Sequence, residues 1–234
     1  MYEYRGLQDV YFLMLYGVAT FFALLACGYL LLRRGNAFTD EVRSSRKLRR
    51  WTAAFMAAIA ASHVWWYVLG IYWLADDRVV RNITAILLDH ITLVPLMIGV
   101  LLAMLQDRKR PLWPWLVAHV PVVGAAVVGI DQRSTFYGEE MAHLYQLVVV
   151  VVFVVYYVNA QLQYGRWLLD NYADLERKEV WQSMLFALAL FIVFELYSSN
   201  AGELQREYLS QLITIAVIGF LLWRVETLQE LEEK

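Results

Sequence analysis

The stretch from Ile83 to Leu105 reads ITAILLDHITLVPLMIGVLLAML. It is apolar for almost its whole length, and it has the roughly 20 residues that a helix needs to cross the hydrocarbon of a bilayer. The apolar residues are continuous rather than alternating, and the run is too long for a barrel strand. We therefore expect a membrane-spanning helix, in which Asp89 and His90 are the ionisable exceptions.

Similar runs recur along the whole chain. We place the membrane spans at 8–32, 51–74, 83–105, 111–130, 142–164, 181–199 and 208–224. The composition agrees, because 60% of residues are hydrophobic and the mean hydropathy is +0.47. Charged residues make up 18% of the chain, less than the roughly 25% of soluble domains. The sequence thus predicts an all-α integral membrane protein whose seven-helix domain covers residues 1–224.

Positive charge gathers in alternate connections between the spans. One set holds most of the cations: Arg33, Arg34, Arg43, Arg46, Lys47, Arg49, Arg50, Arg108, Lys109, Arg110, Arg166, Arg177 and Lys178. The other set holds Arg5, Arg78, Arg81, Arg133 and Arg206. Because Lys and Arg are enriched in cytoplasmic loops, we expect the N-terminus outside and the C-terminus inside. The expected location is a bacterial inner membrane.

Several function classes find no support in the sequence. The net charge of −2 argues against nucleic acid as a partner, and the single Cys27 cannot form an intrachain disulfide. No Walker, GxSxG or HExxH motif occurs. No lysine lies within an expected span, which excludes the usual retinal Schiff base. We therefore expect neither an enzyme nor a bound cofactor.

The last expected span continues into the segment WRVETLQELEEK, residues 223–234. Leu221, Val225 and Leu228 are spaced by four and then three residues, as at the start of a heptad repeat. We expect residues 225–234 to form a cytoplasmic helical stem. The alternative is a terminal helical turn with ordinary solvated charges.

Two segments resemble the N-terminal membrane region of a group of bacterial sensor histidine kinases. They are YGRWLLDNYADLERKEVW at 164–181 and LWRVETL at 222–228, about a tenth of the chain. In that group a multi-helix membrane module precedes dimerisation helices and an ATP-binding domain. This chain has no phospho-acceptor histidine after the last span and no ATP-binding boxes. The resemblance therefore implies the sensor module alone, as a homodimer in membrane lipid with a cytoplasmic kinase-type partner.

Ionisable residues at membrane depth are costly, so each is a candidate functional residue. The outer layer of the bundle is our preferred ligand site, and its residues are Asp89, His90, His143, Glu195 and Gln211, with Asp9, Tyr16 and Thr214 nearby. Such a pocket suits a cation, or a proton, because histidine titrates near neutral pH. Adjacent side chains point about 100° apart on a helix, so Asp89 and His90 cannot both face the same neighbour.

Three alternatives remain for these polar residues. They can simply pair with neighbouring helices and hold the bundle together, or they can line the path of a transporter or channel. His63 and His119 fall near the midplane on different helices, where two imidazoles can be axial ligands of a haem.

Prolines and glycines add a further expectation. Pro95 and Pro121 can kink the third and fourth spans, and Gly70, Gly99 and Gly219 can allow close contacts between helices.

Overall fold

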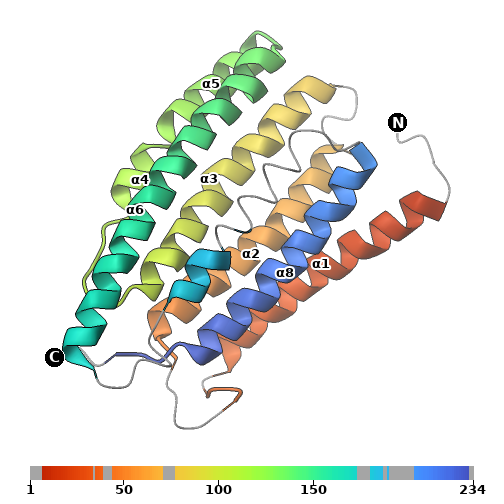
Figure 1. Ribbon diagram of the computed structural model, residues 1–234. Coiled ribbons are helices and arrows are strands. Elements are labelled where there is room, and N and C mark those ends of the chain that lie inside the picture. The colour runs from red at the N-terminus through yellow and green to blue at the C-terminus, as the bar shows by residue number, and fades with distance from the viewer. Residues whose placement is uncertain are drawn as a thin grey trace.

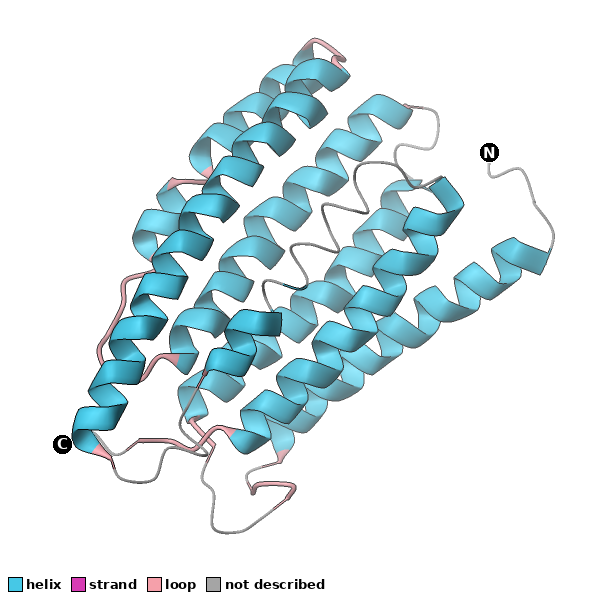
Figure 2. Cartoon of the chain, in the orientation of Figure 1, coloured by secondary structure: helices cyan, strands magenta, loops and turns pink. Residues whose placement is uncertain are grey.

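The structure is a computed structural model that describes residues 7–33, 35–38, 44–70, 77–172, 180–186, 189 and 203–231. Within this part of the chain every regular element is helical, which confirms the predicted all-α fold (Figure 2). The elements are α1 (Leu7–Leu32), α2 (Arg46–Val68), α3 (Arg78–Met104), α4 (Trp113–Val117), α5 (Val120–Asp131), the π-helix η2 (Phe136–Met141), α6 (Ala142–Asn171) and α8 (Glu203–Thr227). Residues 181–186 are also helical.

Five helical segments are long and apolar enough to cross a membrane. They are Val10–Leu32, Arg78–Met104, Trp113–Asp131, Phe136–Asn171 and Tyr208–Thr227, and they match the first, third, fourth, fifth and seventh expected spans. Helix α2 covers most of the second expected span, but it is less apolar because it carries cations in its first turn and His63 further along. The chain thus has the character of a multi-pass membrane protein. Most of the sixth expected span lies outside the described residues.

The helices form two groups that meet at α3 (Figure 1). Helix α1 packs on α2 and α8, and α2 packs on α3 and α8. On the other side α3 packs on α5, which packs on α6. The helical segment 181–186 approaches α8, where Phe186 and Phe220 stack with their ring centroids 3.8 Å apart.

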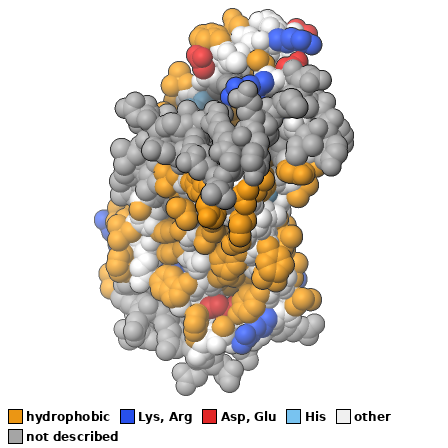
Figure 3. All heavy atoms as spheres, turned by 90° about the vertical axis from the view of Figure 1, so that its right-hand side faces the viewer, with side chains coloured by type: hydrophobic (Ala, Val, Ile, Leu, Met, Phe, Trp, Pro, Cys, Tyr) orange, Lys and Arg blue, Asp and Glu red, His pale blue; other side chains and the backbone are white. Residues whose placement is uncertain are grey.

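Helix α1 shows how the apolar residues divide between lipid and protein. Its small residues Ala19, Ala23 and Ala26 are buried, which lets α1 approach its neighbours closely. Large apolar side chains such as Phe21 and Leu24 are more than half exposed. Figure 3 shows that hydrophobic side chains dominate the middle of the face on the α1 and α8 side, with most charged side chains nearer the two ends. This distribution fits a helix that faces lipid.

The densest core lies toward one end of the bundle, where α1, α3, α6 and α8 finish and α2 begins (Figure 1). We call this the basic end, because the cation-rich connections lie there. Fully buried side chains from several helices meet in it: Leu48, Met56, Val100, Met104, Leu168, Ile218 and Leu221. The basic end is therefore a packed structure with its own core.

Helix α8 ends at Thr227, so the prediction of a helical stem is wrong for residues 228–231. The residues of the apparent heptad, Val225 and Leu228 among them, are buried in the chain's own core. Their spacing serves packing within the bundle. In the sequence, the same spacing looks like the start of a coiled coil.

The chain beyond α8 crosses the basic end in an extended form. Gln229 pairs with Ser44 in an isolated antiparallel bridge. The Gln106 side chain donates a hydrogen bond to the Gln229 carbonyl (3.0 Å) and accepts one from the Leu231 amide (2.9 Å). These contacts fix the segment to the loops before α2 and after α3.

The fourth expected span is broken in the middle. Helix α4 ends at Val117, and α5 begins at Val120 with Pro121 in its first turn. Proline is tolerated in a first turn because it has no amide hydrogen to donate. The predicted kink at Pro121 is thus confirmed as a break, whereas α3 continues through Pro95.

One glycine determines how closely α2 and α3 approach each other. A Cβ on Gly99 would lie 2.5 Å from Cε3 of Trp51, whereas a Cβ on Gly219 would meet nothing within 4 Å. The expected close contact is therefore confirmed at Gly99 and absent at Gly219.

Replacing Gly99 by alanine is expected to lower the free energy of unfolding by about 1–3 kcal/mol, because the Trp51 ring must move. Unfolding in dodecylmaltoside micelles with added SDS measures this change. Gly219→Ala, in the middle of α8, is the matched control and should be neutral or slightly stabilising. Equal stability of the two variants would contradict the packing described here.

Candidate functional site

Asp89 and His90 face different neighbours, as the helix geometry requires. Asp89 bonds to α2, whereas His90 interacts electrostatically with His119 and His143 on the side of α5 and α6. The residues expected in one outer pocket therefore belong to two clusters. Glu195 lies outside the described residues, as does the Asp9 side chain. Thr214 bonds within its own helix, to the carbonyl of Ser210.

The Asp89 carboxylate is held by three donors from one face of α2. Oδ1 accepts hydrogen bonds from Ser62 Oγ (2.6 Å) and Trp65 Nε1 (3.1 Å), and Oδ2 accepts one from Trp66 Nε1 (2.8 Å). Residues 62, 65 and 66 lie on the same helix face because they are three and four positions apart. No Lys or Arg pairs with Asp89 in the described part of the chain. The hydrogen-bond partners of the carboxylate among the described residues are therefore neutral donors of α2.

His63 lies beside this carboxylate and connects α2 to α8. Its Nδ1 lies 2.8 Å from the Ile59 carbonyl oxygen, and its Nε2 lies 2.8 Å from Oε1 of Gln211. The ring also packs on Tyr16 of α1, with centroids 4.5 Å apart, and the Tyr16 hydroxyl donates to the His63 carbonyl. We call Asp89, Ser62, Trp65, Trp66, His63, Gln211 and Tyr16 the Asp89 network. It joins α1, α2, α3 and α8.

The hydrogen-bond partners of His63 have a chemical consequence. A neutral imidazole offers one donor and one acceptor, whereas an imidazolium offers two donors. The Ile59 carbonyl and Gln211 Oε1 are both acceptors, so this arrangement suits the doubly protonated ring. A neutral ring protonated on Nδ1 would instead require the Gln211 amide to turn and present its NH2 group, and a ring protonated on Nε2 would leave Nδ1 facing the Ile59 carbonyl. The protonation state of His63 is therefore linked to a side chain on α8.

The other three histidines form a second group. His119 lies at the break between α4 and α5, where its Nδ1 is 2.6 Å from the Trp115 carbonyl oxygen. Its Nε2 is buried without a hydrogen-bond partner among the described residues, as are both polar atoms of the Gln146 amide on α6. Gln146 lies three positions after His143, on the same face of α6. We call His90, His119, His143 and Gln146 the histidine cluster.

The structure does not favour the metal and haem alternatives. Among the described residues, no three His, Cys, Asp or Glu side chains are placed to hold a metal ion. Both ring nitrogens of His63 are occupied by Ile59 and Gln211, so His63 has no free nitrogen for iron. His63 and His119 belong to different clusters.

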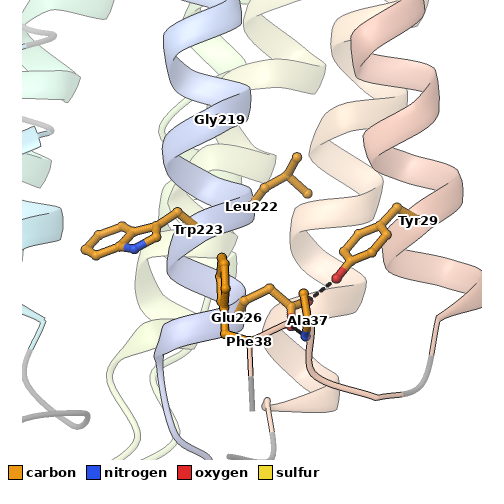
Figure 4. A pocket seen from close by; sticks show the side chains of 7 residues that line it. All are labelled: Tyr29, Ala37, Phe38, Gly219, Leu222, Trp223 and Glu226. Carbon is orange, nitrogen blue, oxygen red and sulfur yellow. Dashed lines mark hydrogen bonds between the residues drawn. The ribbon is translucent and has the colours of Figure 1, made fainter.

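A buried ion pair at the basic end escaped the sequence analysis. Arg49 Nη1 lies 2.8 Å from Oε1 of Glu226, and the two side chains are 9% and 4% exposed. The Tyr29 hydroxyl also donates to Oε1 (3.0 Å), and the Ala37 amide donates to Oε2 (2.8 Å). Figure 4 shows Glu226 between Tyr29 and Ala37, beside a hollow of about 360 Å³. Glu226 thus ties α8 to α1, to α2 and to the loop between them.

Further bonds reinforce this junction. Asn36 Nδ2 donates to the Glu226 carbonyl (2.6 Å), and Arg49 Nη2 donates to the Arg33 carbonyl (2.7 Å). The neighbouring Arg224 is buried and donates to Ser183 Oγ (3.2 Å) and Gln182 Oε1 (3.0 Å). The segment 222–228 therefore contacts the residues that directly follow segment 164–181, at the basic end.

Comparison with known protein families, with curated proteins and with solved structures finds no match to this chain.

Proposed function

We propose that this protein is a membrane sensor whose Asp89 network responds to a proton or a cation and transmits the change through α8. In this proposal the bundle has seven spans in a bacterial inner membrane, with the basic end in the cytoplasm, as the distribution of cations favours. A homodimer and a kinase-type cytoplasmic partner follow from the resemblance of segments 164–181 and 222–228 to sensor histidine kinases. The chain itself carries out no catalysis.

The observation that carries the proposal is the position of His63 between two acceptors, beside Asp89. Loss of the Nε2 proton leaves Nε2 as an acceptor that faces another acceptor. The Gln211 amide must then turn, and the bond that its Nε2 now donates to Ser210 Oγ (3.2 Å) must reverse, with the Ser210 hydroxyl as the donor. A proton at His63, or a cation that neutralises Asp89, therefore changes the contact between α2 and α8.

Helix α8 connects this contact to the basic end. Fifteen residues separate Gln211 from Glu226, which is about 22 Å along a helix. Ile218 and Leu221 between them are fully buried and apolar, so this part of α8 is packed against its neighbours. A change in packing at Gln211 is expected to reach Glu226 through this rigid segment.

A reporter at the end of α8 tests the proposal. Cys27 is replaced by alanine, and a single cysteine at position 230 carries an environment-sensitive fluorophore in nanodiscs. Its emission should differ between acidic and neutral buffer, because the two protonation states of an imidazole need different hydrogen-bond partners. His63→Gln should abolish the change, because glutamine cannot gain a proton there. His119→Gln is the matched control and should keep the response.

Two results would reject this mechanism: an emission that does not depend on pH in the parent protein, or a response that persists in His63→Gln.

A transporter is the second candidate, and the broken fourth span favours it. Interrupted helices at membrane depth often form transport sites. Here the break places the buried His119 in a cluster whose buried polar atoms have no partner among the described residues. Proteoliposomes with an internal pH-sensitive dye measure proton flux directly. A flux that is lost in His119→Gln and kept in His63→Gln would replace the sensor proposal.

A further inference from the structure

A basic hollow opens on the surface of α2 at the basic end. It has a volume of about 610 Å³ and is lined by Arg46, Lys47, Arg50, Trp51, Ala54 and Glu230. The site is separate from the Asp89 network and from the Arg49–Glu226 pair. It contributes nothing to the sensor mechanism as proposed, so its cations require another explanation.

The lining residues share one face of α2. Arg46, Arg50 and Ala54 are successive positions four apart, which places them in one row along the helix. Leu48 and Arg49, between them in the sequence, are buried. The cations of the run RKLRR, residues 46–50, therefore differ in their environment. Arg49 is buried in the core, whereas the other three cations lie at the surface.

The cations of the hollow are not paired with a carboxylate in the described part of the chain. Arg46, Lys47 and Arg50 are exposed, and none makes an ion pair among the described residues. Other cations at this end are engaged, since Arg49 pairs with Glu226 and Arg110 pairs with Asp107. Three exposed cations and one carboxylate, that of Glu230, line the hollow, so it carries an excess of positive charge.

The hollow lies at the level where the membrane boundary is expected. The apolar span of α1 ends at Leu32, and that of α3 ends at Met104. Trp51 is half-buried, and its ring lies over Gly99. Tryptophan favours the headgroup region of a bilayer. One turn beyond the cations, the small Ala54 is exposed, which leaves space beside α2 for an acyl chain.

We propose that this hollow binds the headgroup of an anionic phospholipid. The phosphate lies between Arg46, Lys47 and Arg50. The two guanidinium groups can bind it with paired hydrogen bonds, and the Lys47 ammonium adds a third positive charge. The glycerol and the start of the acyl chains pass Trp51 and Ala54 toward the hydrocarbon. Basic pockets at the cytoplasmic side of membrane helices are a known chemistry for acidic lipid headgroups.

Native mass spectrometry of the delipidated full chain in a neutral detergent tests the proposal. Phosphatidylglycerol is the probe. Phosphatidylcholine is the zwitterionic comparison lipid with no net charge, and glycerol 3-phosphate is the soluble comparison without acyl chains. Phosphatidylglycerol should bind markedly more tightly than either. Arg50→Gln should weaken its binding about fivefold, because each cation near an anionic surface contributes about that factor. Glu230→Gln removes the opposing charge and should tighten binding by a similar factor.

Arg166→Gln is the matched control, since Arg166 is an exposed arginine near the end of α6, and it should change nothing. The variant with Arg46, Lys47 and Arg50 all replaced by glutamine should lose about a hundredfold. If the triple variant fails to fold, Arg50→Gln and Glu230→Gln still test the proposal, because the first should weaken lipid binding and the second should tighten it. Equal binding of phosphatidylcholine, equal binding of glycerol 3-phosphate, or unchanged affinity in Arg50→Gln and Glu230→Gln would each overturn the proposal.

Discussion

Replacing Glu226 by glutamine is expected to lower the free energy of unfolding by about 3–5 kcal/mol. The variant leaves the positive charge of Arg49 in a site that is only 8% exposed, without an anion to balance it. The bonds from Tyr29 and Ala37 also lose their charged acceptor. SDS-induced unfolding in dodecylmaltoside, followed by circular dichroism, measures the loss.

Two comparisons separate this ion pair from a general effect of charge. Glu230→Gln removes an exposed carboxylate four residues further on and should change stability by less than about 0.5 kcal/mol. The double variant Arg49→Met, Glu226→Leu removes both charges and should recover most of the loss, because buried pairs are often replaceable by apolar residues. If Glu226→Gln were as stable as Glu230→Gln, the buried junction would be refuted.

The second large effect is expected at Asp89. Asp89→Leu leaves the donors of Ser62, Trp65 and Trp66 without their acceptor, and each unsatisfied buried donor costs about 1–3 kcal/mol. A total loss of about 3 kcal/mol or more is expected in the same unfolding assay. Asp89→Asn keeps one acceptor oxygen and should lose about half as much.

Tryptophan fluorescence provides an independent measurement of the same contact. Loss of the indole hydrogen bonds should shift the emission in Asp89→Leu. Asp131, an exposed aspartate at the end of α5, gives the control, because Asp131→Asn should alter neither stability nor emission. Wild-type stability in Asp89→Leu would mean that the three donors find other partners.

The spans could be predicted from the sequence because hydropathy reports burial in lipid directly. Their ends could not, because they depend on tertiary contacts. Helix α2 begins at Arg46 rather than at 51, since Leu48 and Arg49 pack into the core. Helix α3 begins at Arg78, where the Asp77 side chain caps it by accepting from the Val80 amide (3.1 Å). Helix α6 continues to Asn171 because Tyr164 and Leu168 are buried.

The candidate site was predictable only in part. The rule for adjacent helical residues correctly separates Asp89 from His90. The neighbours that these side chains contact depend on how each helix is rotated about its axis. The pairing of His63 with Gln211 is a further example, because it joins residues 148 positions apart. The buried position of Glu226 was not predicted, because a glutamate in a charged terminal segment is expected to be exposed to solvent. The one available signal was its place between the apolar Val225 and Leu228.

The ties around Glu226 restrict how α8 can move. Its carboxylate and carbonyl hold Tyr29, Asn36, Ala37 and Arg49 at 2.6–3.0 Å. Sliding of the helix along its axis by even one ångström would stretch several of these bonds beyond their normal length. Asn36, Ala37 and the start of α2 must therefore move together with the end of α8 as a single block. A partner of the kind we propose would meet residues 35–38 and 228–231 together, and it would detect a tilt of this block.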